Sequence, residues 1–223
     1  MKSSPDKTAI VIGATGLIGS CLMRLLINAD HIARVVVITR RPTSYSSAKV
    51  QNHVIDFDEL GDYEHLFKGD IFFSCLGTTL KQVGSRVAQR VVDFDYQYIA
   101  AKLAYQQGVN HYLLVSSSSA NAKSASAYLK MKGELEDRVE ALGFNHVSIL
   151  QPSLLLGERQ QPRLAEGLAG KVFPLICRIP GLRRYRPIKG KEVAQKMLEL
   201  SIKPTALLER VTLDKVFPNG SKI

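Results

Sequence analysis

The stretch TAIVIGATGLIGSCLMRLL, from Thr8 to Leu26, decides the fold of this chain. Its apolar start, Ala9 to Ile12, predicts a buried strand, and apolar residues at helical spacing after the third glycine predict a helix. Each glycine between them suits a nucleotide site: the first permits a tight turn, the second lets the backbone approach a pyrophosphate, and the third lets the helix pack close to the strand. The N-terminus of that helix would present free N–H groups to the phosphates. We therefore expect a bound dinucleotide, rather than an ordinary glycine turn, at Gly13, Ala14, Thr15, Gly16, Leu17, Ile18 and Gly19.

Strands and helices alternate along the rest of the chain. This alternation is typical of an α/β fold with a doubly wound parallel sheet, Rossmann-like, in a single domain over residues 1–223. Past Pro152 the pattern loosens, and we expect residues 153–223 to form a small C-terminal cap on the substrate side, integrated with that domain. Residues 80–91 have no clear pattern. The expected later strands are 35–39, 50–57, 70–76, 111–115, 145–150 and 210–213, and the expected later helices are 60–67, 92–107, 126–142 and 190–202.

The composition excludes several classes of protein. No apolar run reaches the roughly 18 residues of a membrane-spanning helix, and the N-terminus lacks a signal-like apolar region. The scattered cysteines, Cys21, Cys75 and Cys177, indicate free thiols in a reducing compartment, so a cytoplasmic location is predicted. The histidines do not have the spacing of metal ligands, and no metal site is predicted.

The net charge of +10 is concentrated near the C-terminus, where residues 151–223 hold 14 Lys and Arg against 6 Asp and Glu. Much of the excess lies in the segment 178–191. Such a segment can attract phosphate groups, nucleic acid or an anionic membrane, or it can be a solvated face. Because it has one aromatic residue, Tyr185, and is interrupted by prolines and glycines, we disfavour a nucleic acid or a membrane helix and expect a small-molecule substrate.

The ends of three expected strands suggest contacts with the dinucleotide. The second strand ends in Arg40 and Arg41, at the place where an acidic residue would take the ribose 2′-hydroxyl of NAD. Guanidinium groups suit a 2′-phosphate instead, which favours NADP(H), with NAD(H) as the alternative and uninvolved surface arginines as the other reading. We also expect contacts with the adenine at Asp56 and Phe57, and with the cofactor at Leu76, Gly77 and Thr78.

Tyr128 and Lys132 are the catalytic candidates. On a helix, positions i and i+4 share a face, so a phenol and an ammonium can meet one ligand. An ammonium beside a phenol favours the phenolate, which makes a tyrosine a usable proton donor and acceptor. Only Tyr128 opens a helix after the fifth strand and follows the serine cluster 116–119, whose hydroxyls can hydrogen-bond a reacting carbonyl. The spacing alone does not decide, because it recurs at Tyr45/Lys49, Tyr98/Lys102 and Tyr185/Lys189.

These motifs together resemble the short-chain dehydrogenase/reductase superfamily. The sequence is more similar still to its atypical branch, the Tat-interacting-protein-like (metastasis-suppressor) oxidoreductases. The resemblance covers most of the chain up to about residue 160 and is weaker beyond it. It is carried by ITRR (38–41), CLGTT (75–79), VDFDY (92–96), LLVSS (113–117), YLKMKGELE (128–136) and LLGERQ (155–160).

The resemblance implies a Rossmann-like fold that binds NADPH, with Tyr128 as proton donor and acceptor and Lys132 on the nicotinamide ribose. It places the catalytic serine at Ser117, with Ser116 and Ser118 one register step away. It further implies contacts with the nicotinamide end at residues 152–159, from Pro152 to Arg159, where Arg159 could hold an anion. Longer relatives carry a larger C-terminal substrate domain, so the substrate stays open.

Three functions follow as hypotheses. The first is an NADP(H)-dependent oxidoreductase that transfers hydride between nicotinamide and a carbonyl or alcohol, using Ser117, Tyr128 and Lys132. The second is a nucleotide-sugar epimerase or dehydratase, in which basic residues of the tail would grip a diphosphate. The third is a regulatory protein that senses NADPH and binds a protein partner without turnover.

Overall fold

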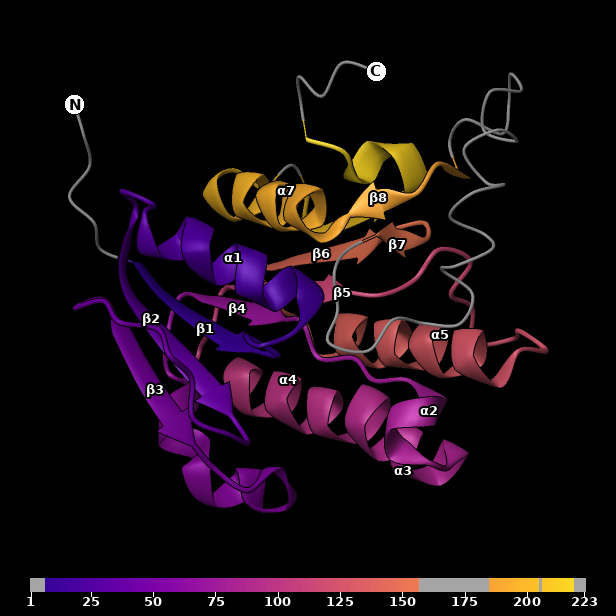
Figure 1. Cartoon of the computed structure of the whole chain (residues 1–223), viewed down its shortest axis with the longest axis horizontal. Helices are drawn as coiled ribbons and strands as arrows, with labels where there is room; N and C mark the ends of the chain where they lie inside the picture. The colour runs from indigo at the N-terminus through magenta and orange to yellow at the C-terminus, as the bar shows by residue number, and fades with distance from the viewer. Residues whose placement is uncertain (1–6, 157–184, 205, 219–223) are drawn as a thin grey trace.

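The computed structural model describes residues 7–156, 185–204 and 206–218. Within them, the main sheet has seven strands, all parallel, in the order β3-β2-β1-β4-β5-β6-β9 (Figure 1). This arrangement confirms the predicted Rossmann-like fold. The strands are β1 (Lys7–Ile12), β2 (Ile32–Thr39), β3 (Val50–Val54), β4 (Ile71–Ser74), β5 (His111–Val115), β6 (His146–Gln151) and β9 (Leu208–Thr212).

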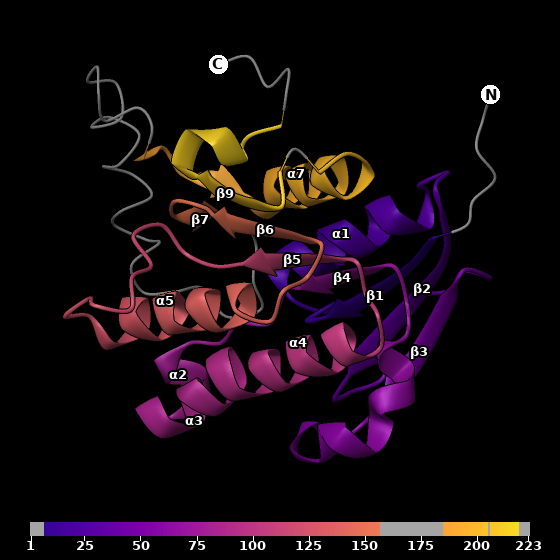
Figure 2. The ribbon, with the colours of Figure 1, turned by 180° about the vertical axis from the view of Figure 1, so that it is seen from behind.

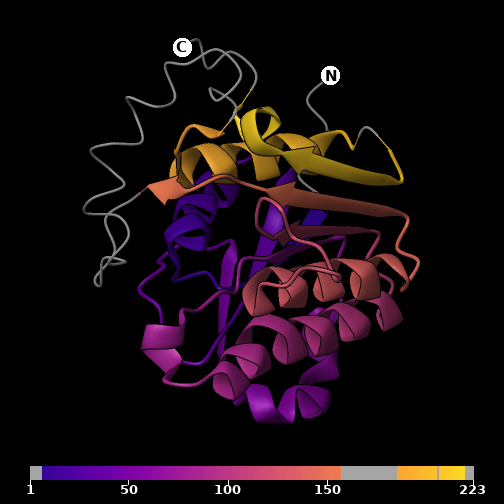
Figure 3. The ribbon, with the colours of Figure 1, turned by 90° about the vertical axis from the view of Figure 1, so that its right-hand side faces the viewer.

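Helices cover both faces of this sheet (Figures 1 and 2). On one face lie α1 (Leu17–Ile27) and α7 (Gly190–Ile202); on the other lie α4 (Tyr96–Gln106), α5 (Ala127–Glu140) and the 3-10 segment η1 (Phe57–Phe67). The quarter-turn view in Figure 3 shows the sheet between the two helical layers. The shorter elements are α2 (Leu80–Val83), α3 (Arg86–Arg90), the π-helical turn η2 (Val91–Asp95), β7 (Leu155–Leu156), β8 (Ile188–Lys189) and the 3-10 turn η4 (Leu213–Val216).

Alternate residues of the central strands pack into two separate cores. In β1, Ile10 and Ile12 face α4 and α5, whereas Ala9 and Val11 face α1 and α7. All four side chains are fully buried. A parallel sheet covered on both faces needs apolar residues on both, which is why the sequence of β1 shows no polar alternation.

The described part of the C-terminal region is built into the core. Strand β9 pairs with β6 as the last strand of the sheet, and α7 lies against α1. Gly190 allows this approach, because a Cβ there would lie only 2.8 Å from Leu17 Cγ. Strand β9 and helix α7 therefore extend the sheet and one helical layer, and the small substrate-side cap expected over 153–223 stays a prediction. Residues 157–184, with Cys177 and the start of the basic segment, lie outside the described residues.

Several element boundaries differ from the sequence prediction, and two of the differences have a visible local cause. The third strand ends at Val54, three residues early, because the Asp56 side chain accepts a hydrogen bond from the Asp58 N–H at 2.9 Å and starts η1. Non-helical backbone at Glu59 and Tyr63 then breaks the helix expected at 60–67 into 3-10 turns. Residues 80–91, which have no clear sequence pattern, form α2 and α3, each capped by a hydroxyl side chain.

In the described part of the chain, no helix combines the length and the apolar composition that crossing a membrane requires. In the same residues, no group of three or more potential ligand side chains could hold a metal ion. Cys21 and Cys75 are free thiols, and burial raises the pKa of Cys75 to about 12.

A buried polar chain links the amino-terminal half of β5 to β6 and β9. The Ser148 hydroxyl donates to Glu209 Oε1 at 2.8 Å, so the His111 Nε2, 2.9 Å from Ser148 Oγ, is the donor to that hydroxyl. The His111 side chain is only 4% exposed. Burial, and secondarily the charge of His146, lowers the pKa of His111 from 6.5 to about 4.

This pKa predicts a loss of stability in acid. Between pH 6.5 and about 4 the unfolded chain binds a proton at residue 111 that the folded chain does not, so the free energy of unfolding falls as pH falls. The full effect is roughly 3 kcal/mol. Urea unfolding across this range should show a shallower pH dependence for His111→Gln than for the wild type. Equal slopes for His111→Gln and the wild type would contradict the assignment.

Candidate active site

The turns after β1, β4, β5 and β6 lie along one edge of the sheet, because these strands are parallel neighbours. The chain runs outward from β1 through β2 to β3, and then returns to β4 on the other side of β1. In open parallel sheets, ligands bind at the carboxyl ends of the strands where the order reverses in this way. The residues predicted from the sequence gather along this edge.

The glycine turn has the backbone geometry that its sequence predicts. Gly13 has φ +77°, and a Cβ there would lie 2.4 Å from the Cys75 backbone in the turn after β4. A Cβ at Gly19 would lie 2.1 Å from the Gly13 carbonyl oxygen, so α1 packs directly on the turn. At Gly16 the nearest atom would be 3.3 Å away. Gly13 and Gly19 are therefore required by packing within the protein, whereas Gly16 lies in a more open place.

The N-terminus of α1 suits an anionic group. No side chain caps this helix at Gly16, and its first turn holds no acidic residue. The first N–H groups of a helix have no partners within it, and the helix dipole adds positive potential there. The turn therefore fits the diphosphate of a dinucleotide, which stays a prediction for Gly13 to Gly19.

Tyr45 ties the loop after β2 to this glycine turn. Its hydroxyl donates to the Ala14 carbonyl oxygen at 2.7 Å, although Tyr45 follows the turn by some thirty residues. The same loop begins with Arg40 and Arg41, both exposed, and the Thr39 hydroxyl donates to the Arg41 carbonyl at 2.8 Å. The two guanidinium groups are thus carried by a loop anchored at the glycine turn. Sequence reasoning missed this role, because the bond depends on how the loop folds back.

Asp56 and Phe57 occupy different environments. Asp56 is exposed at the end of the strand, as a ligand contact requires. The Phe57 ring is 2% exposed and packs edge-on against Tyr96, with ring centroids 5.6 Å apart. The predicted side-chain contact with adenine is therefore wrong for Phe57, whose ring is held in the core, and stays a prediction for Asp56.

A buried carboxylate holds the turn after β4. The Thr78 N–H donates to Asp93 Oδ1 at 2.7 Å, and Asp93 is fully buried on the π-helical turn η2. Gln97 on α4 holds Asp93 in turn. Its amide nitrogen donates to the Asp93 backbone carbonyl oxygen, and its amide oxygen accepts from the Ser74 hydroxyl, each at 2.8 Å. This arrangement sets the place of Leu76, Gly77 and Thr78. Asp93 could have been suspected from the sequence, since a carboxylate within a predicted buried helix face needs a partner.

Tyr128 and Lys132 lie one turn apart on α5, so their side chains leave the helix on the same side. Tyr128 is partly buried against the core, and Lys132 is only 3% exposed. None of the ion pairs among the described residues includes Lys132. A buried ammonium with no carboxylate beside it is costly, and it fits a ligand that presents hydroxyl groups.

The other tyrosines with the same spacing are placed differently. The Tyr45 hydroxyl is committed to Ala14. The Tyr98 ring packs against Phe94 on α4, with centroids 6.2 Å apart. Tyr185 lies beyond the sheet's central strands, beside the short strand β8. Of these four tyrosines, Tyr128 is the one at the start of the helix that directly follows β5.

The structure narrows the choice among the serines after β5. Ser116 is 6% exposed, and its hydroxyl donates to Glu136 on α5. Ser117 is partly exposed, and its hydroxyl makes one long contact, 3.5 Å, with the Ser118 carbonyl oxygen. Ser116 is therefore committed to a buried partner, and Ser117 stays the predicted catalytic serine.

The strand-end residue Pro152 is buried beside this serine loop, and its carbonyl oxygen accepts from the Ser118 N–H at 3.0 Å. This bond places the turn after β6 against the serines. Arg159, the other residue predicted at the nicotinamide end, lies outside the described residues.

Gly133, next to Lys132, lets the serine loop cross α5. A Cβ there would lie 2.2 Å from the Ala122 nitrogen and 2.3 Å from the Asn121 carbonyl carbon. Asn121 also donates its N–H to the Leu129 carbonyl oxygen at 3.1 Å. The loop from Ser117 to α5 is therefore held against the helix by backbone contacts.

Comparison with known proteins gives both family and fold. The NAD(P)H-binding family matches residues 13–172. Protein HTATIP2 of Rattus norvegicus is 37% identical over 172 residues, covering 75% of this chain and 71% of that protein. Protein FMP52, mitochondrial, of Meyerozyma guilliermondii is 34% identical over 218 residues, covering 96% and 93%. The solved structure of MoeE5 in complex with UDP-glucose and NAD has a TM-score of 0.69 at 17% identity, over 93% of this chain and 75% of that one, which shows the shared fold.

The relatives also correct one prediction. FMP52 proteins of several fungi, 32–38% identical to this chain, are named as mitochondrial. The cytoplasmic location predicted from the cysteines and the N-terminus is therefore wrong. Scattered free cysteines indicate a reducing compartment and do not tell the cytosol from other such compartments.

The close contact at Gly133 predicts that a change to alanine destabilises the protein, the reverse of its usual effect in a helix. Alanine normally stabilises a helix by about 1 kcal/mol relative to glycine, but here the added Cβ collides with backbone. We expect Gly133→Ala to lower the free energy of unfolding by about 1–3 kcal/mol in urea or thermal melts. Gly61→Ala is the control, because a Cβ there meets no atom within 4 Å. A Gly133→Ala variant as stable as the wild type would contradict the described path of the loop.

Proposed function

The chain belongs to the NAD(P)H-binding family, in the atypical branch of the short-chain dehydrogenase/reductases related to HTATIP2, and we propose that it is an NADP(H)-dependent oxidoreductase of a small carbonyl or alcohol substrate. The observation that carries the proposal is the placement of Tyr128 one turn before the buried Lys132 on the helix after β5, where no ion pair among the described residues includes Lys132. The loop between β5 and that helix supplies Ser117.

The bound nicotinamide would supply or accept the hydride. Ser117 then donates a hydrogen bond to the substrate oxygen and orients it. Tyr128 gives a proton to that oxygen during reduction and takes it back during oxidation. Lys132 would bind the ribose hydroxyls and so orient the nicotinamide beside Tyr128. Proton transfer of this kind contributes about 10²–10⁴-fold to the rate.

The preference for NADP(H) is supported by the end of β2. Arg40 and Arg41 stand there without a carboxylate that would bind a ribose 2′-hydroxyl. Their loop is fastened to the glycine turn through the Tyr45 hydroxyl, which supports a site shared by the arginines and the diphosphate. A guanidinium group can bind a 2′-phosphate by paired hydrogen bonds.

Removing the Tyr128 hydroxyl should separate chemistry from binding. We expect Tyr128→Phe to lower kcat by at least about 10²-fold, because the proton donor is lost, while the NADPH Kd stays within about twofold. Cofactor oxidation with a panel of aldehydes and ketones, and calorimetry with NADPH, provide the two readouts. Tyr98→Phe serves as the control, since that ring packs on α4.

Several outcomes of this panel would change the proposal. Undiminished turnover in Tyr128→Phe would remove the tyrosine from the mechanism. A substrate altered without net consumption of the cofactor would favour the epimerase or dehydratase. Tight NADPH binding with no turnover of any carbonyl would favour the NADPH-sensing protein.

The arginine pair should set the preference between the two nicotinamide cofactors. We expect Arg40→Ala/Arg41→Ala to raise the NADPH Kd by about 10–100-fold, the effect of losing charge-assisted hydrogen bonds, with the NADH Kd unchanged. Arg34→Ala is the matched control, because Arg34 is exposed on the same strand near its other end. Equal losses for NADPH and NADH would contradict this account of specificity.

A further inference from the structure

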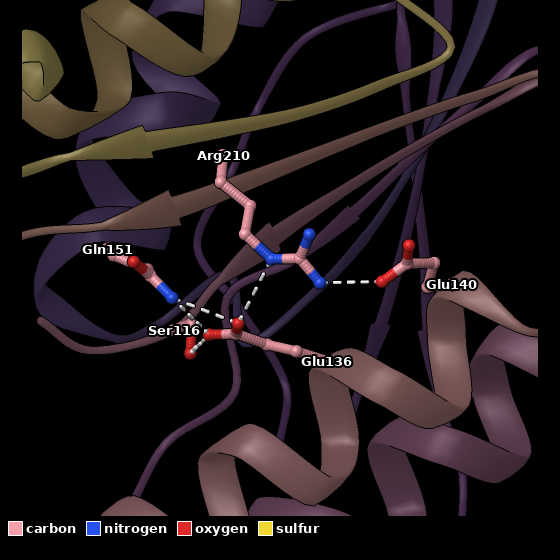
Figure 4. Close-up of polar contacts among 5 residues, drawn as sticks. All are labelled: Ser116, Glu136, Glu140, Gln151 and Arg210. Atoms are coloured by element: carbon pink, nitrogen blue, oxygen red, sulfur yellow. Dashed lines mark hydrogen bonds and ion pairs between the residues drawn. The ribbon is translucent and has the colours of Figure 1, made fainter. Parts of the chain in front are cut away.

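A buried carboxylate, Glu136 on α5, faces Ser116, Gln151 and Arg210 (Figure 4). It is 3% exposed and accepts three hydrogen bonds. One comes from the Ser116 hydroxyl at the end of β5. The other two come from the Gln151 amide at the end of β6, which lies 2.9 Å from each carboxylate oxygen.

A side chain of strand β9 also contacts Glu136. Arg210 on β9 places its Nε 3.6 Å from Glu136 Oε2 and bonds Glu140, one turn further along α5, through Nη2 at 2.5 Å. Burial raises the pKa of Glu136, and the bonds from Gln151 and Ser116 and the charge of Arg210 oppose that rise. One carboxylate thus joins α5 to the ends of β5 and β6 and to the middle of β9.

The bonded residues are the immediate neighbours of the site. Ser116 precedes Ser117, and Gln151 precedes Pro152, whose carbonyl receives the Ser118 N–H. Glu136 itself follows Lys132 by four residues, so it lies on the same face of α5 as Lys132 and Tyr128. The groups expected to bind the substrate oxygen and to move the proton therefore belong to two elements that meet at Glu136.

We propose that Glu136 is a positioning residue that holds the Ser117 loop in register with Tyr128 and Lys132, acting through Ser116 and Gln151. The catalytic part of this role rests on the proposed function; the anchoring of the loop does not. An apolar residue at 136 would pack as well, but it would leave a buried hydroxyl and a buried amide without acceptors. A carboxylate is suited to this place because it accepts from both strand ends at once.

Amide hydrogen exchange of the protein without cofactor tests the anchoring. The reporters are the Ser116 N–H, bonded to the Leu150 carbonyl at 2.8 Å, and the Ser118 N–H, bonded to Pro152. We expect both to exchange about tenfold faster in Glu136→Gln and in Ser116→Ala, since each change loses one buried hydrogen bond. Glu140→Gln is the control, because Glu140 bonds Arg210 and is partly exposed. Should Glu136→Gln fail to fold, Ser116→Ala, which removes one hydroxyl, carries the same test.

Kinetics test the catalytic role. In Glu136→Gln and in Ser116→Ala we expect kcat to fall about tenfold while the NADPH Kd stays within about twofold. The double variant should lose no more than Glu136→Gln alone, because Ser116 acts through its bond to Glu136. A loss of stability alone would not produce that non-additivity.

The outcomes separate this inference from the proposed function. Unchanged exchange at 116 and 118 in both variants, additive losses of kcat, or equal effects of Glu140→Gln would overturn the positioning role. If the exchange result holds but the wild type turns over no carbonyl substrate, the oxidoreductase proposal falls and Glu136 remains the anchor of the loop.

Discussion

The structure depends on a backbone contact at the point where the strand order reverses. The turn after β1 touches the turn after β4 so closely that any side chain at residue 13 would overlap the Cys75 backbone. The same turn supports α1 through Gly19, and its Ala14 carbonyl receives the Tyr45 hydroxyl. Because the contacts at Gly13 and Gly19 are between backbone groups, they set the position of the helix N-terminus against the sheet edge independently of most side chains. This constraint suits the diphosphate site that we propose at that N-terminus.

The opposite side of the edge is held by buried carboxylates. Asp93 receives the N–H of the turn after β4, and Glu136 receives the hydroxyl and amide that end β5 and β6. Each lies on a helical segment of the same layer, so that layer determines where the strand-end turns stand. Buried anions are costly unless their hydrogen bonds are satisfied. Both carboxylates bond the turns at the strand ends, where the accurate position of the chain has a functional use.

The sequence predicts most of the fold and only the outline of the site. Strand β5 and helix α7 have their predicted bounds, because apolar periodicity and flanking glycine mark them locally. The role of Glu136 depends on Gln151 and Arg210, which contact it only once the sheet has formed. No local sequence pattern indicates such long-range contacts. Its position two turns after Tyr128 is the signal that could have found it. Phe57 shows the converse: a residue at a strand end was predicted to meet a ligand, but its apolar ring is better buried against Tyr96. Location failed as a prediction because composition does not distinguish one reducing compartment from another.

The central claim is that one dinucleotide reaches from the glycine turn to the tyrosine and lysine of α5. A crystal structure of the protein grown with NADP⁺ tests it most directly. The account predicts the diphosphate on the N–H groups at the start of α1, the 2′-phosphate beside Arg40 and Arg41, and the nicotinamide ribose hydrogen-bonded to the Lys132 ammonium. A dinucleotide bound elsewhere, or a nicotinamide remote from Lys132 and Tyr128, would contradict it.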